Sequence, residues 1–251
     1  MSLFDLSGRW AIVTGANTGI GQAIAVGLAN AGADIVGVGR SAITQTEADV
    51  RALGRRFVTV SADLSRTGSA ARVISGALEA GATPDILVNN AGIIRRGDSL
   101  DFTEEDWDAV LDTNLKSVFF LCQAFARAAL AAERRAKIIN IASMLSFQGG
   151  IRVPSYTAAK SGLAGITRLL ANEWAGSGIN VNAIAPGYVE TNNTMALRAD
   201  AERNADILKR IPAGRWARPE DMAGAAVFLA SPASDYVHGA ILPVDGGWLA
   251  R

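Results

Sequence analysis

A tyrosine and a lysine stand four residues apart in the stretch PSYTAAK, at Tyr156 and Lys160. Two residues at this spacing share one face of a helix. An unperturbed tyrosine has a pKa of about 10 and is a poor base at neutral pH, but a neighbouring ammonium favours the phenolate. The pair is therefore suited to exchange a proton with an oxygen atom, which hydride transfer between a nicotinamide and a carbonyl requires.

Two further polar residues could take part in the same chemistry. Ser143 ends a predicted strand at 137–143, and an open parallel sheet presents its ligand-binding groups at the carboxyl ends of its strands. Asn114 lies inside a predicted helix at 104–127, where a polar amide is expected to have a hydrogen-bonding or catalytic role. If these residues have no catalytic role, Tyr156 and Lys160 are an incidental pair on a helix face, and the Asn114 amide only forms structural hydrogen bonds.

Three glycines follow the first predicted strand, which spans 10–15, and precede a predicted helix at 21–32. They are Gly15, Gly19 and Gly21 in the stretch VTGANTGIGQAI. Glycines allow a tight turn and let backbone amides approach a pyrophosphate, and the helix start adds unpaired N–H groups and the positive end of its dipole. The loop therefore predicts a bound nucleotide.

Strands and helices alternate along the chain and must bring these groups together. Further strands are predicted at 34–39, 57–63, 85–92, 179–187 and 240–247, and further helices at 155–176 and 219–230. The apolar residues of helix 104–127 fall on or near one face: Trp107, Leu111, Leu115, Val118 and Phe125.

This order of elements predicts an α/β fold in a single domain spanning 1–251. The sheet is expected to be doubly wound, parallel and mostly seven-stranded, with helices on both faces, as in a Rossmann fold. The 188–212 segment is the least sheet-like part and follows the carboxyl end of a strand. We therefore expect a substrate lid at about 188–212.

Composition argues against several functions. Lysine plus arginine equals aspartate plus glutamate, at 24 each, which gives no indication of nucleic acid or of an anionic membrane as a partner. The only cysteine, Cys122, excludes an internal disulfide and a cysteine metal cluster, and the only histidine, His238, argues against a metal site or a catalytic triad. No apolar run reaches the ~20 residues of a membrane span, and the N-terminus lacks the features of a signal peptide. A cytoplasmic protein without a metal is expected.

The combined motifs resemble the short-chain dehydrogenase/reductase family over essentially the whole chain. The matching positions are the glycine spacing with Thr14, NNAG at 89–92, Asn114, Ser143, Tyr156, Lys160 and PG at 186–187. The resemblance implies Tyr156 as general acid and base, and Ser143 as the binder of the substrate oxygen. It implies that Lys160 shifts the tyrosine pKa and anchors the nicotinamide ribose, and that Asn114 holds a water that relays protons to the lysine. It also implies a homotetramer.

The same resemblance implies the residues that contact the cofactor. For Asp63 it implies a contact with the adenine amino group, whereas the alternative is a cap on the next helix. The implied set is Gly15, Asn17, Thr18, Gly19, Ile20, Gly21, Arg40, Asp63, Leu64, Asn90, Ala91, Gly92, Tyr156, Lys160, Pro186, Gly187, Val189 and Thr191.

The end of the second strand bears on which nucleotide is bound. In dinucleotide-binding folds an acidic residue there binds the ribose 2′-hydroxyl and repels a 2′-phosphate. Here Gly39 and Arg40 occupy the position, and the guanidinium could form charge-assisted bonds to a phosphate. We expect an NAD(P)(H) cofactor, with NADP(H) favoured over NAD(H), while a missing acid would permit both.

Five segments resemble one branch of the family, the 2-deoxy-D-gluconate 3-dehydrogenases or 2-dehydro-3-deoxy-D-gluconate 5-dehydrogenases: NNAGIIRRGD, IASMLSFQGGIRVPSY, APGYVETNNT, RIPAGRW and VDGGWLAR. The resemblance implies a small-molecule substrate, a ketone or secondary alcohol of a deoxy sugar acid. Its carboxylate and hydroxyls could meet Arg95, Arg96, Ser143, Gln148, Arg152, Tyr156, Asn192, Asn193 and Thr194. The alternatives are a 3-oxoacyl-carrier-protein reductase or another short-chain carbonyl reductase, and a non-catalytic nucleotide-binding sensor or scaffold.

Overall fold

A parallel sheet forms the centre of the computed structural model, which describes residues 3–250. The sheet has seven strands in the order β3-β2-β1-β4-β5-β6-β7, and the order reverses between β1 and β4, the kind of switch point at which such sheets bind ligands. The predicted fold class is confirmed. The strands are β1 Trp10–Thr14, β2 Asp34–Gly39, β3 Phe57–Ser61, β4 Pro84–Asn89, β5 Ala136–Ile141, β6 Ile179–Pro186 and β7 Ile241–Val244.

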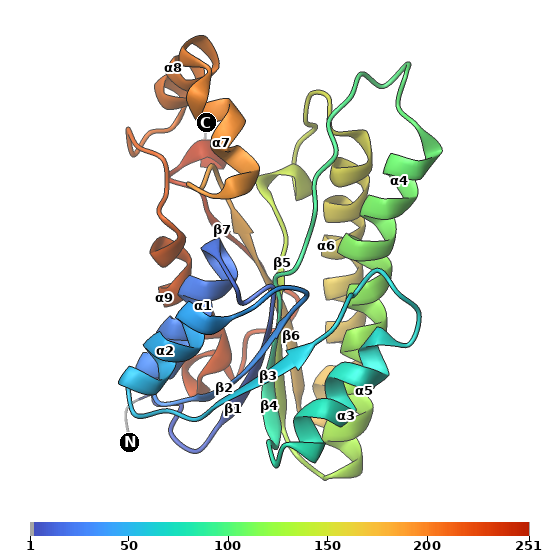
Figure 1. Cartoon of the computed structure of the whole chain (residues 1–251), viewed down its shortest axis with the longest axis vertical. Coiled ribbons are helices and arrows are strands. Elements are labelled where there is room, and N and C mark those ends of the chain that lie inside the picture. The colour runs from blue at the N-terminus through green and yellow to red at the C-terminus, as the bar shows by residue number, and fades with distance from the viewer. Residues whose placement is uncertain (1–2, 251) are drawn as a thin grey trace.

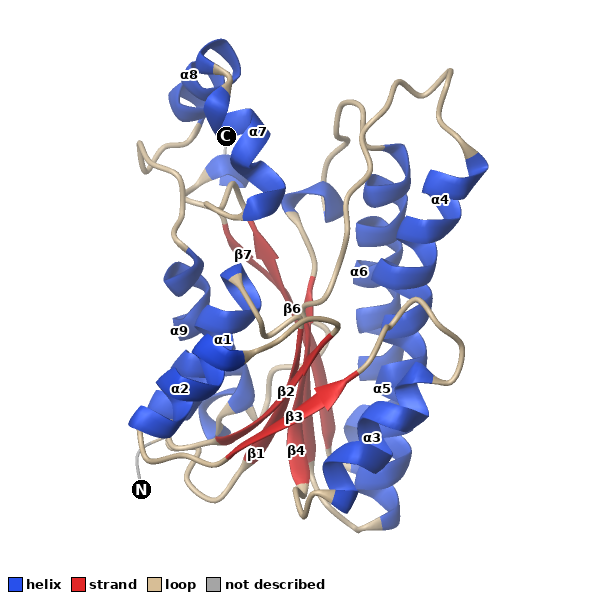
Figure 2. Cartoon of the chain, viewed as in Figure 1, coloured by secondary structure: helices blue, strands red, loops and turns tan. Residues whose placement is uncertain are grey.

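Helices cover both faces of this sheet (Figure 1, Figure 2). α1, α2 and α9 lie over one face, α3, α5 and α6 lie over the other, and α4 lies beside α6. α7 and α8 stand beyond the carboxyl end of β7. The bounds are α1 Gly19–Asn30, α2 Thr44–Ala52, α3 Ser69–Glu79, α4 Glu104–Leu111, α5 Ser117–Ala131, α6 Pro154–Trp174, α7 Met195–Ala199, α8 Ala201–Arg210 and α9 Ala223–Ala230.

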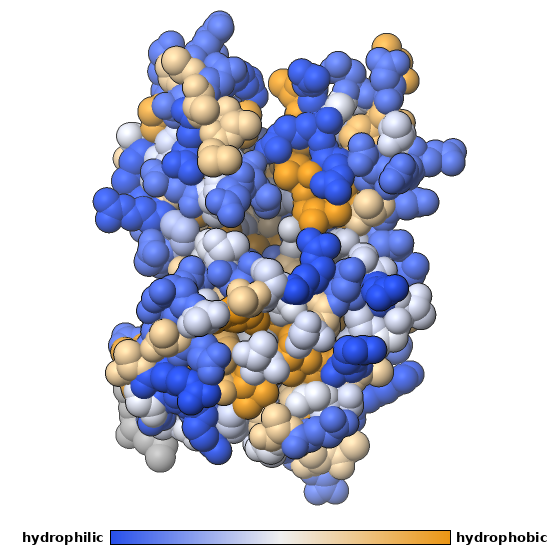
Figure 3. Space-filling model, in the orientation of Figure 1, coloured by the Kyte–Doolittle hydropathy of each residue, from blue (hydrophilic) through white to orange (hydrophobic). Residues whose placement is uncertain are grey.

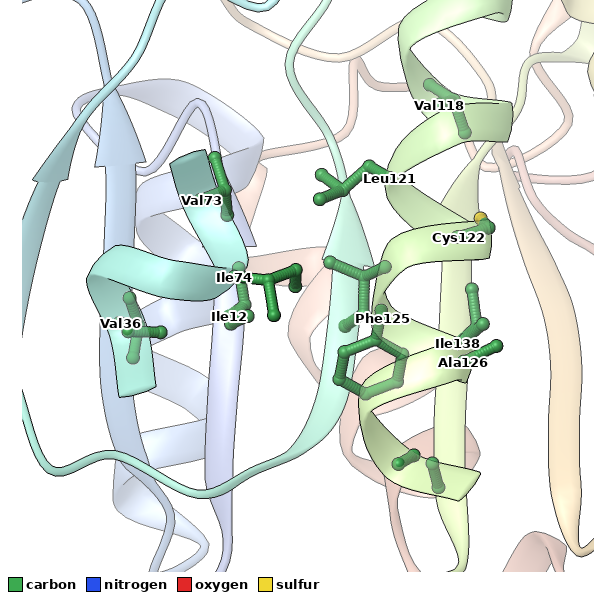
Figure 4. Close-up of a cluster of buried hydrophobic side chains, with 14 of the residues drawn as sticks. Ile12, Val36, Val73, Ile74, Val118, Leu121, Cys122, Phe125, Ala126 and Ile138 are labelled. Carbon is green, nitrogen blue, oxygen red and sulfur yellow. The ribbon is translucent and has the colours of Figure 1, made fainter. Parts of the chain in front are cut away.

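The strands are apolar on both faces because helices cover both faces. Figure 4 shows Leu121 and Phe125 of α5 pointing toward the space that Ile12 of β1 and Ile74 of α3 also fill. Burying each such large side chain contributes about 1.5–3 kcal/mol. A second cluster packs α1 and α9 on the opposite face. Within residues 3–250, no helix combines the length and the apolar character that crossing a membrane needs.

The helix predicted at 104–127 is present, but it is not one regular α-helix. A π-helical turn at Asp112–Lys116 separates α4 from α5, and the extra residue of such a turn rotates the following helix face relative to the preceding one. Val118 and Phe125 therefore face the core, whereas Trp107 remains 40% exposed. The turn includes Asn114, which is fully buried, and π turns of this kind are frequent at functional sites.

The 188–212 segment lies at the carboxyl end of the sheet, where Figure 1 shows it in orange beyond β7. It contains a short 3₁₀ turn at Asn192–Thr194 followed by α7 and α8. Ile207 and Ile211, near its end, are buried in a cluster with Trp216 and Trp248. Val189, at its start, is also buried, whereas the middle of the segment is largely exposed, so both ends attach the segment to the rest of the chain.

Candidate active site

The glycine loop leaves the start of α1 open for an anion. Gly15 and Gly19 have φ angles of 64° and 57°, a left-handed region that residues other than glycine rarely adopt. Within the described residues, the N-cap residue Thr18 forms no side-chain cap bond, and the first turn of α1 carries no acidic side chain. The first N–H groups of α1 are therefore available to a phosphate, which fits the dinucleotide that the sequence predicts.

Asn90 fixes the glycine loop across the switch point. Its Nδ2 donates to the carbonyl oxygens of Thr14 at 2.9 Å and Gly15 at 3.3 Å. Oγ1 of Thr14 accepts from the backbone N–H groups of Asn90 at 2.9 Å and Ala91 at 3.0 Å. A Cβ atom on Gly21 would collide with the Gly15 carbonyl and the Asn90 amide. The NNAG motif therefore joins β1 to β4.

A cavity of about 170 Å³ lies beside this loop, at the carboxyl ends of β2 and β3. It is lined by several residues of the predicted cofactor set: Gly15, Asn17, Arg40, Asp63, Leu64, Ala91 and Gly92. Sequence reasoning missed Ser41, which also lines the cavity and whose Oγ accepts from Nδ2 of Asn17 at 3.0 Å. Its place directly after Arg40 is the signal that could have identified it.

Asp63 presents its carboxylate at the edge of the cavity. It accepts hydrogen bonds from the hydroxyl of Ser65 at 2.8 Å and from the Ser65 backbone N–H at 3.1 Å. These bonds, with smaller contributions from Arg40 and Arg66, hold the pKa of Asp63 below its usual value. The next helix, α3, starts only at Ser69, so Asp63 caps a local turn and not that helix.

Ser143 and Tyr156 meet beyond the carboxyl end of β5. Oγ of Ser143 accepts from the backbone N–H of Leu145 at 3.1 Å, which leaves the hydroxyl hydrogen for Tyr156. Burial raises the pKa of Tyr156, and the hydrogen bond with Ser143 and the charge of Arg96 offset this only in part. The tyrosine is therefore a proton donor at neutral pH.

Lys160 comes from the same helix and is 5% exposed. Its Nζ donates to the carbonyl oxygen of Ile141 at 2.6 Å and lies 5.5 Å from the centre of the Tyr156 ring. Burial lowers the pKa of Lys160 to about 8. Ser143 and Arg96 lower the pKa of Tyr156, but burial outweighs them, and the role of Lys160 in shifting this pKa stays a prediction.

The Asn114 amide is bound to the loop after β4. Its Oδ1 accepts from the backbone N–H of Ile93 at 2.9 Å, and its Nδ2 donates to the Ile93 carbonyl at 2.8 Å. The Asn114 side chain thus holds this loop in place. Its backbone carbonyl lies in the π turn, where the regular helical hydrogen-bond pattern is interrupted, and is the better candidate for the predicted water relay.

The chain after β6 lies against the glycine loop. A Cβ atom on Gly19 would lie 3.4 Å from the methyl group of Thr191, so Thr191 faces the predicted phosphate site. Gly187 packs so closely against Asp245 that a Cβ atom there would lie 2.7 Å from the Asp245 Cα. Val189 is only 3% exposed and packs in the core. Of the predicted cofactor residues Gly187, Val189 and Thr191, it is thus Thr191 that lies opposite the glycine loop.

Known proteins resemble this chain over nearly its whole length. Residues 15–249 match a family model described as enoyl-(acyl carrier protein) reductase. The chain is 59% identical over 251 residues to the 2-dehydro-3-deoxy-D-gluconate 5-dehydrogenase of Escherichia coli strain K12, covering 100% of this chain and 99% of that protein. The chain belongs to the short-chain dehydrogenase/reductase family. The resemblance seen in the sequence is confirmed.

Solved structures of short-chain dehydrogenases match this chain over its length. An Agrobacterium tumefaciens protein with bound NADP is 62% identical, with a TM-score of 0.94 and full coverage of both chains, 100% each. The gluconate 5-dehydrogenase of Burkholderia cenocepacia J2315, in complex with NADP and tartrate, is 39% identical, with a TM-score of 0.94 and coverage of 99% and 98%. The expected enzyme class, an NAD(P)-dependent dehydrogenase, is confirmed.

Two of the arginines predicted to meet the substrate are paired with carboxylates. Nε of Arg95 lies 3.0 Å from Oδ1 of Asp106, and Nε of Arg152 lies 3.2 Å from Oδ1 of Asp98. All four side chains are substantially exposed. In this short-chain dehydrogenase both guanidinium groups therefore already have a partner outside the catalytic cluster.

Arg96 is placed differently from its neighbour. Its Nη2 donates to the backbone carbonyl of Asn193 in the 188–212 segment at 2.9 Å, and its charge helps to lower the pKa of Tyr156. In the described part of the chain no carboxylate lies within ion-pair distance of Arg96. Among these three arginines, Arg96 is thus the one whose charge acts on Tyr156.

Figure 3 shows the surface hollowed between the 188–212 segment, at upper left, and the α4 and α6 side, at upper right. Of the polar residues predicted to meet the substrate, Asn192 and Thr194 lie in the 188–212 segment and Gln148 lies in the loop between β5 and α6. Asn192 and Thr194 belong to the 3₁₀ turn, where Oγ1 of Thr194 donates to the Val189 carbonyl at 2.6 Å. Gln148 contacts Trp248 and Arg210, two residues that sequence reasoning did not assign to the site.

The single cysteine and histidine of this short-chain dehydrogenase lie outside the catalytic cluster. Cys122 is buried in α5, and burial raises the pKa of its thiol to about 12. Nε2 of His238 lies 3.2 Å from Nδ2 of Asn180. Asn180 is at the amino end of β6, whereas Ser143 follows the carboxyl end of β5. Among residues 3–250, no group of three or more His, Cys, Asp or Glu side chains could hold a metal ion.

Proposed function

We propose that this chain interconverts a ketone and a secondary alcohol of a deoxy sugar acid with NADP(H), as an enzyme of the 2-dehydro-3-deoxy-D-gluconate 5-dehydrogenase or 2-deoxy-D-gluconate 3-dehydrogenase type. The observation that carries the proposal is the cluster of Ser143, Tyr156 and Lys160 at the carboxyl end of β5, where Arg96 also carries a charge that lowers the pKa of Tyr156. Two relatives support the substrate class: the Escherichia coli protein bears the first of these names, and the Burkholderia protein holds tartrate, a hydroxy acid.

Tyr156 and Ser143 handle the substrate oxygen in this proposal. When bound, the nicotinamide supplies the hydride. Tyr156 donates its proton to the carbonyl oxygen during reduction and accepts a proton from the alcohol during oxidation. Ser143, whose Oγ is fixed by the Leu145 N–H, donates to the same substrate oxygen and orients it.

Lys160 and Asn114 support the tyrosine. An ammonium has three N–H donors, and one of those on Lys160 is used by the Ile141 carbonyl. The others are available to a ribose hydroxyl and to the water that returns a proton to Tyr156. We assign that water to the backbone carbonyl of Asn114, since the amide of this residue is bound to Ile93.

We assign recognition of the substrate carboxylate to Arg96. A guanidinium matches a carboxylate in shape and charge, and Arg96 contacts the 188–212 segment and carries a charge that lowers the pKa of Tyr156. We propose this segment as a lid. Its contact with Arg96 goes through the Asn193 carbonyl, so a carboxylate bound to Arg96 would draw the lid and the catalytic tyrosine together.

Replacing Arg96 with alanine is expected to raise the KM for the sugar acid about 10- to 100-fold, because a charge-assisted hydrogen bond contributes about 1.5–3 kcal/mol. Steady-state kinetics with purified variants would measure this. Arg95→Ala is the matched control, since Asp106 already neutralises that neighbour. Equal KM values for the two variants would contradict the assignment.

Arg40 and Ser41 support the preference for NADP(H). Both line the cavity at the end of β2, and both can donate hydrogen bonds to a 2′-phosphate. Arg40→Ala is expected to raise the KM for NADPH about 10- to 100-fold and to leave the KM for NADH unchanged. Arg66→Ala, an exposed arginine outside the cavity lining, is the control. An unchanged KM for NADPH in the Arg40 variant would refute the preference.

A 3-oxoacyl-carrier-protein reductase is the second candidate, favoured by the acyl-carrier description of the matching family model. A turnover screen separates the two. It would compare keto-deoxy sugar acids, their carboxamides and acyl thioesters, each with NADH and NADPH. The proposed function requires the fastest turnover on a sugar acid and a clear loss on its carboxamide. Turnover confined to thioesters would favour the second candidate, and no turnover at all would favour a non-catalytic nucleotide-binding protein.

We propose a homotetramer in the cytoplasm. Large apolar side chains are exposed on the outer helices: Phe120 and Leu130 of α5 are 47% and 43% exposed, and Leu169 of α6 is 48% exposed. Burial of these side chains against other copies would explain their exposure on one chain. Light scattering would give the mass of the assembly, and a monomer would rule the tetramer out.

A further inference from the structure

We propose that the end of α8 and the C-terminal turn form a clasp that orients Gln148 for substrate recognition. Trp248 and Arg210 hold the amide oxygen of Gln148, so its NH₂ group is turned toward an acceptor oxygen of the substrate. Trp248 and Arg210 are then positioning residues for specificity. This inference rests on the proposed function for the nature of the substrate, but not for the geometry of the clasp.

The orientation of the Gln148 amide follows from the chemistry of its neighbours. Oε1 of Gln148 accepts from Nε1 of Trp248 at 3.2 Å and from Nη2 of Arg210 at 3.4 Å. An indole N–H and a guanidinium can only donate, so the oxygen end of the amide must face them. The two N–H donors of the Gln148 amide consequently point elsewhere, and within residues 3–250 they have no hydrogen-bond partner.

Trp248 is held in place by the C-terminal turn. The carboxylate of Asp245 accepts from the backbone N–H groups of Gly247 and Leu249, both at 2.9 Å. The backbone N–H of Ala213, just beyond α8, donates to the Gly246 carbonyl at 3.0 Å. The turn therefore packs against the residues at the end of the 188–212 segment, and this packing positions the Trp248 side chain.

Aromatic and cationic contacts join Trp248 to both ends of the 188–212 segment. The Tyr188 ring lies edge-on to two tryptophan rings. Its centroid is 4.9 Å from that of Trp248 and 5.2 Å from that of Trp216. The guanidinium of Arg210 lies 4.0 Å from the centre of the Trp248 ring. The orientation of Gln148 thus depends on the positions of the two ends of the proposed lid.

Gln148 is suited to recognise the substrate because its backbone is tied close to Ser143. Its N–H donates to the carbonyl of Met144 at 3.3 Å, and Met144 directly follows Ser143. A fixed pair of N–H donors near the substrate oxygen binder would favour ligands with a carboxylate or hydroxyl oxygen at that place. A Gln148 amide turned the other way would present an oxygen there and repel the same ligands.

The test is a double-mutant cycle between Trp248 and Gln148, with KM for the sugar acid as the readout. Trp248→Phe keeps an aromatic side chain, though a smaller one, but removes the N–H, and it is expected to raise this KM about 3- to 10-fold, the contribution of one hydrogen bond. In a Gln148→Ala background the same change is expected to have no effect, since Trp248 acts through the amide. The KM for NADPH is expected to stay unchanged throughout.

Two controls keep the result specific. Trp107→Phe makes the same change on α4, away from the clasp, and is expected to leave every constant unchanged. Arg210→Met removes the second donor from an exposed position and is expected to raise the sugar-acid KM alone, even if Trp248→Phe folds poorly. The clasp is refuted if the Trp248 and Arg210 variants keep the wild-type KM, or if Trp248→Phe acts equally in both backgrounds. A wild-type protein that turns over no sugar acid would refute the proposed function instead, and the cycle would be run with the ketone that it does reduce.

Discussion

Replacing Tyr156 with phenylalanine is expected to lower turnover roughly 10²- to 10⁴-fold, the usual contribution of a positioned general acid. The change removes one oxygen atom from a side chain that hydrogen-bonds to Ser143 and whose pKa is raised by burial. The ring that packs beside Lys160 remains. The loss should therefore appear in kcat, while the dissociation constant for NADPH, measured by fluorescence titration, changes little.

Tyr236 provides the matched control for this substitution. It is 99% exposed and lies outside the site, so Tyr236→Phe should have wild-type kinetics. A Tyr156→Phe variant with near-normal turnover would mean that another group moves the proton. The most direct alternative would be a water held by Ser143, and the assignment of Tyr156 would then fail.

Replacing Lys160 with methionine is expected to abolish most activity and yet to stabilise the protein. The pKa of Lys160 is lowered by burial from 10.5 to about 8, so holding the ammonium in the folded state at pH 7 costs roughly 3 kcal/mol. Methionine has no charge to bury but loses the bond to the Ile141 carbonyl. We therefore expect a net gain of about 1–3 kcal/mol in the free energy of unfolding.

The pH dependence of this gain identifies its cause. Below pH 8 the wild-type lysine is charged in both folded and unfolded chains, and the whole cost of burial is present. Between about pH 8 and 10.5 the folded chain releases the proton while the unfolded chain keeps it, so the wild type gains stability and the difference disappears. Urea unfolding of both proteins from pH 7 to 10.5 would measure it. Lys116→Met, at an exposed lysine, should show no such trend, and a pH-independent difference for Lys160→Met would contradict burial of the charge.

Local sequence patterns were sufficient to predict the sheet. The strands from Trp10 to Val244 are short apolar runs separated by helices, and this alternation leaves few arrangements other than a parallel sheet covered on both faces. The interruption at Asn114 could not be predicted in the same way. It depends on two bonds between Asn114 and Ile93, which lie 21 residues apart, and no periodicity within the helix encodes that contact.

The proximity of the candidate residues Ser143, Tyr156 and Lys160 was largely predictable because they occupy characteristic local positions. Tyr156 and Lys160 lie one helical turn apart, and Ser143 follows a strand. The direction of the Tyr156 pKa shift was not predictable, because it depends on burial by segments far apart in the chain. The same holds for Gln148 and Trp248, whose contact joins residues 100 positions apart.

The choice between adjacent arginines shows a further limit of sequence reasoning. Arg95 and Arg96 are identical in type, and nothing in the sequence separates them. In the folded chain, Arg95 meets Asp106 of α4, whereas Arg96 reaches Asn193 across the site. Consecutive residues of an extended loop point to opposite sides, so the direction of the loop decides which arginine can meet the substrate.

The most direct measurement is the transfer of deuterium from NADPH that carries deuterium in both positions at nicotinamide C4. The wild-type protein would be incubated with this cofactor and a keto-deoxy sugar acid, and the product would be analysed by mass spectrometry. Direct hydride transfer predicts an alcohol that carries one deuterium on the former carbonyl carbon, formed far more slowly by Tyr156→Phe. A sugar acid recovered without deuterium, with no cofactor consumed, would contradict the proposed function.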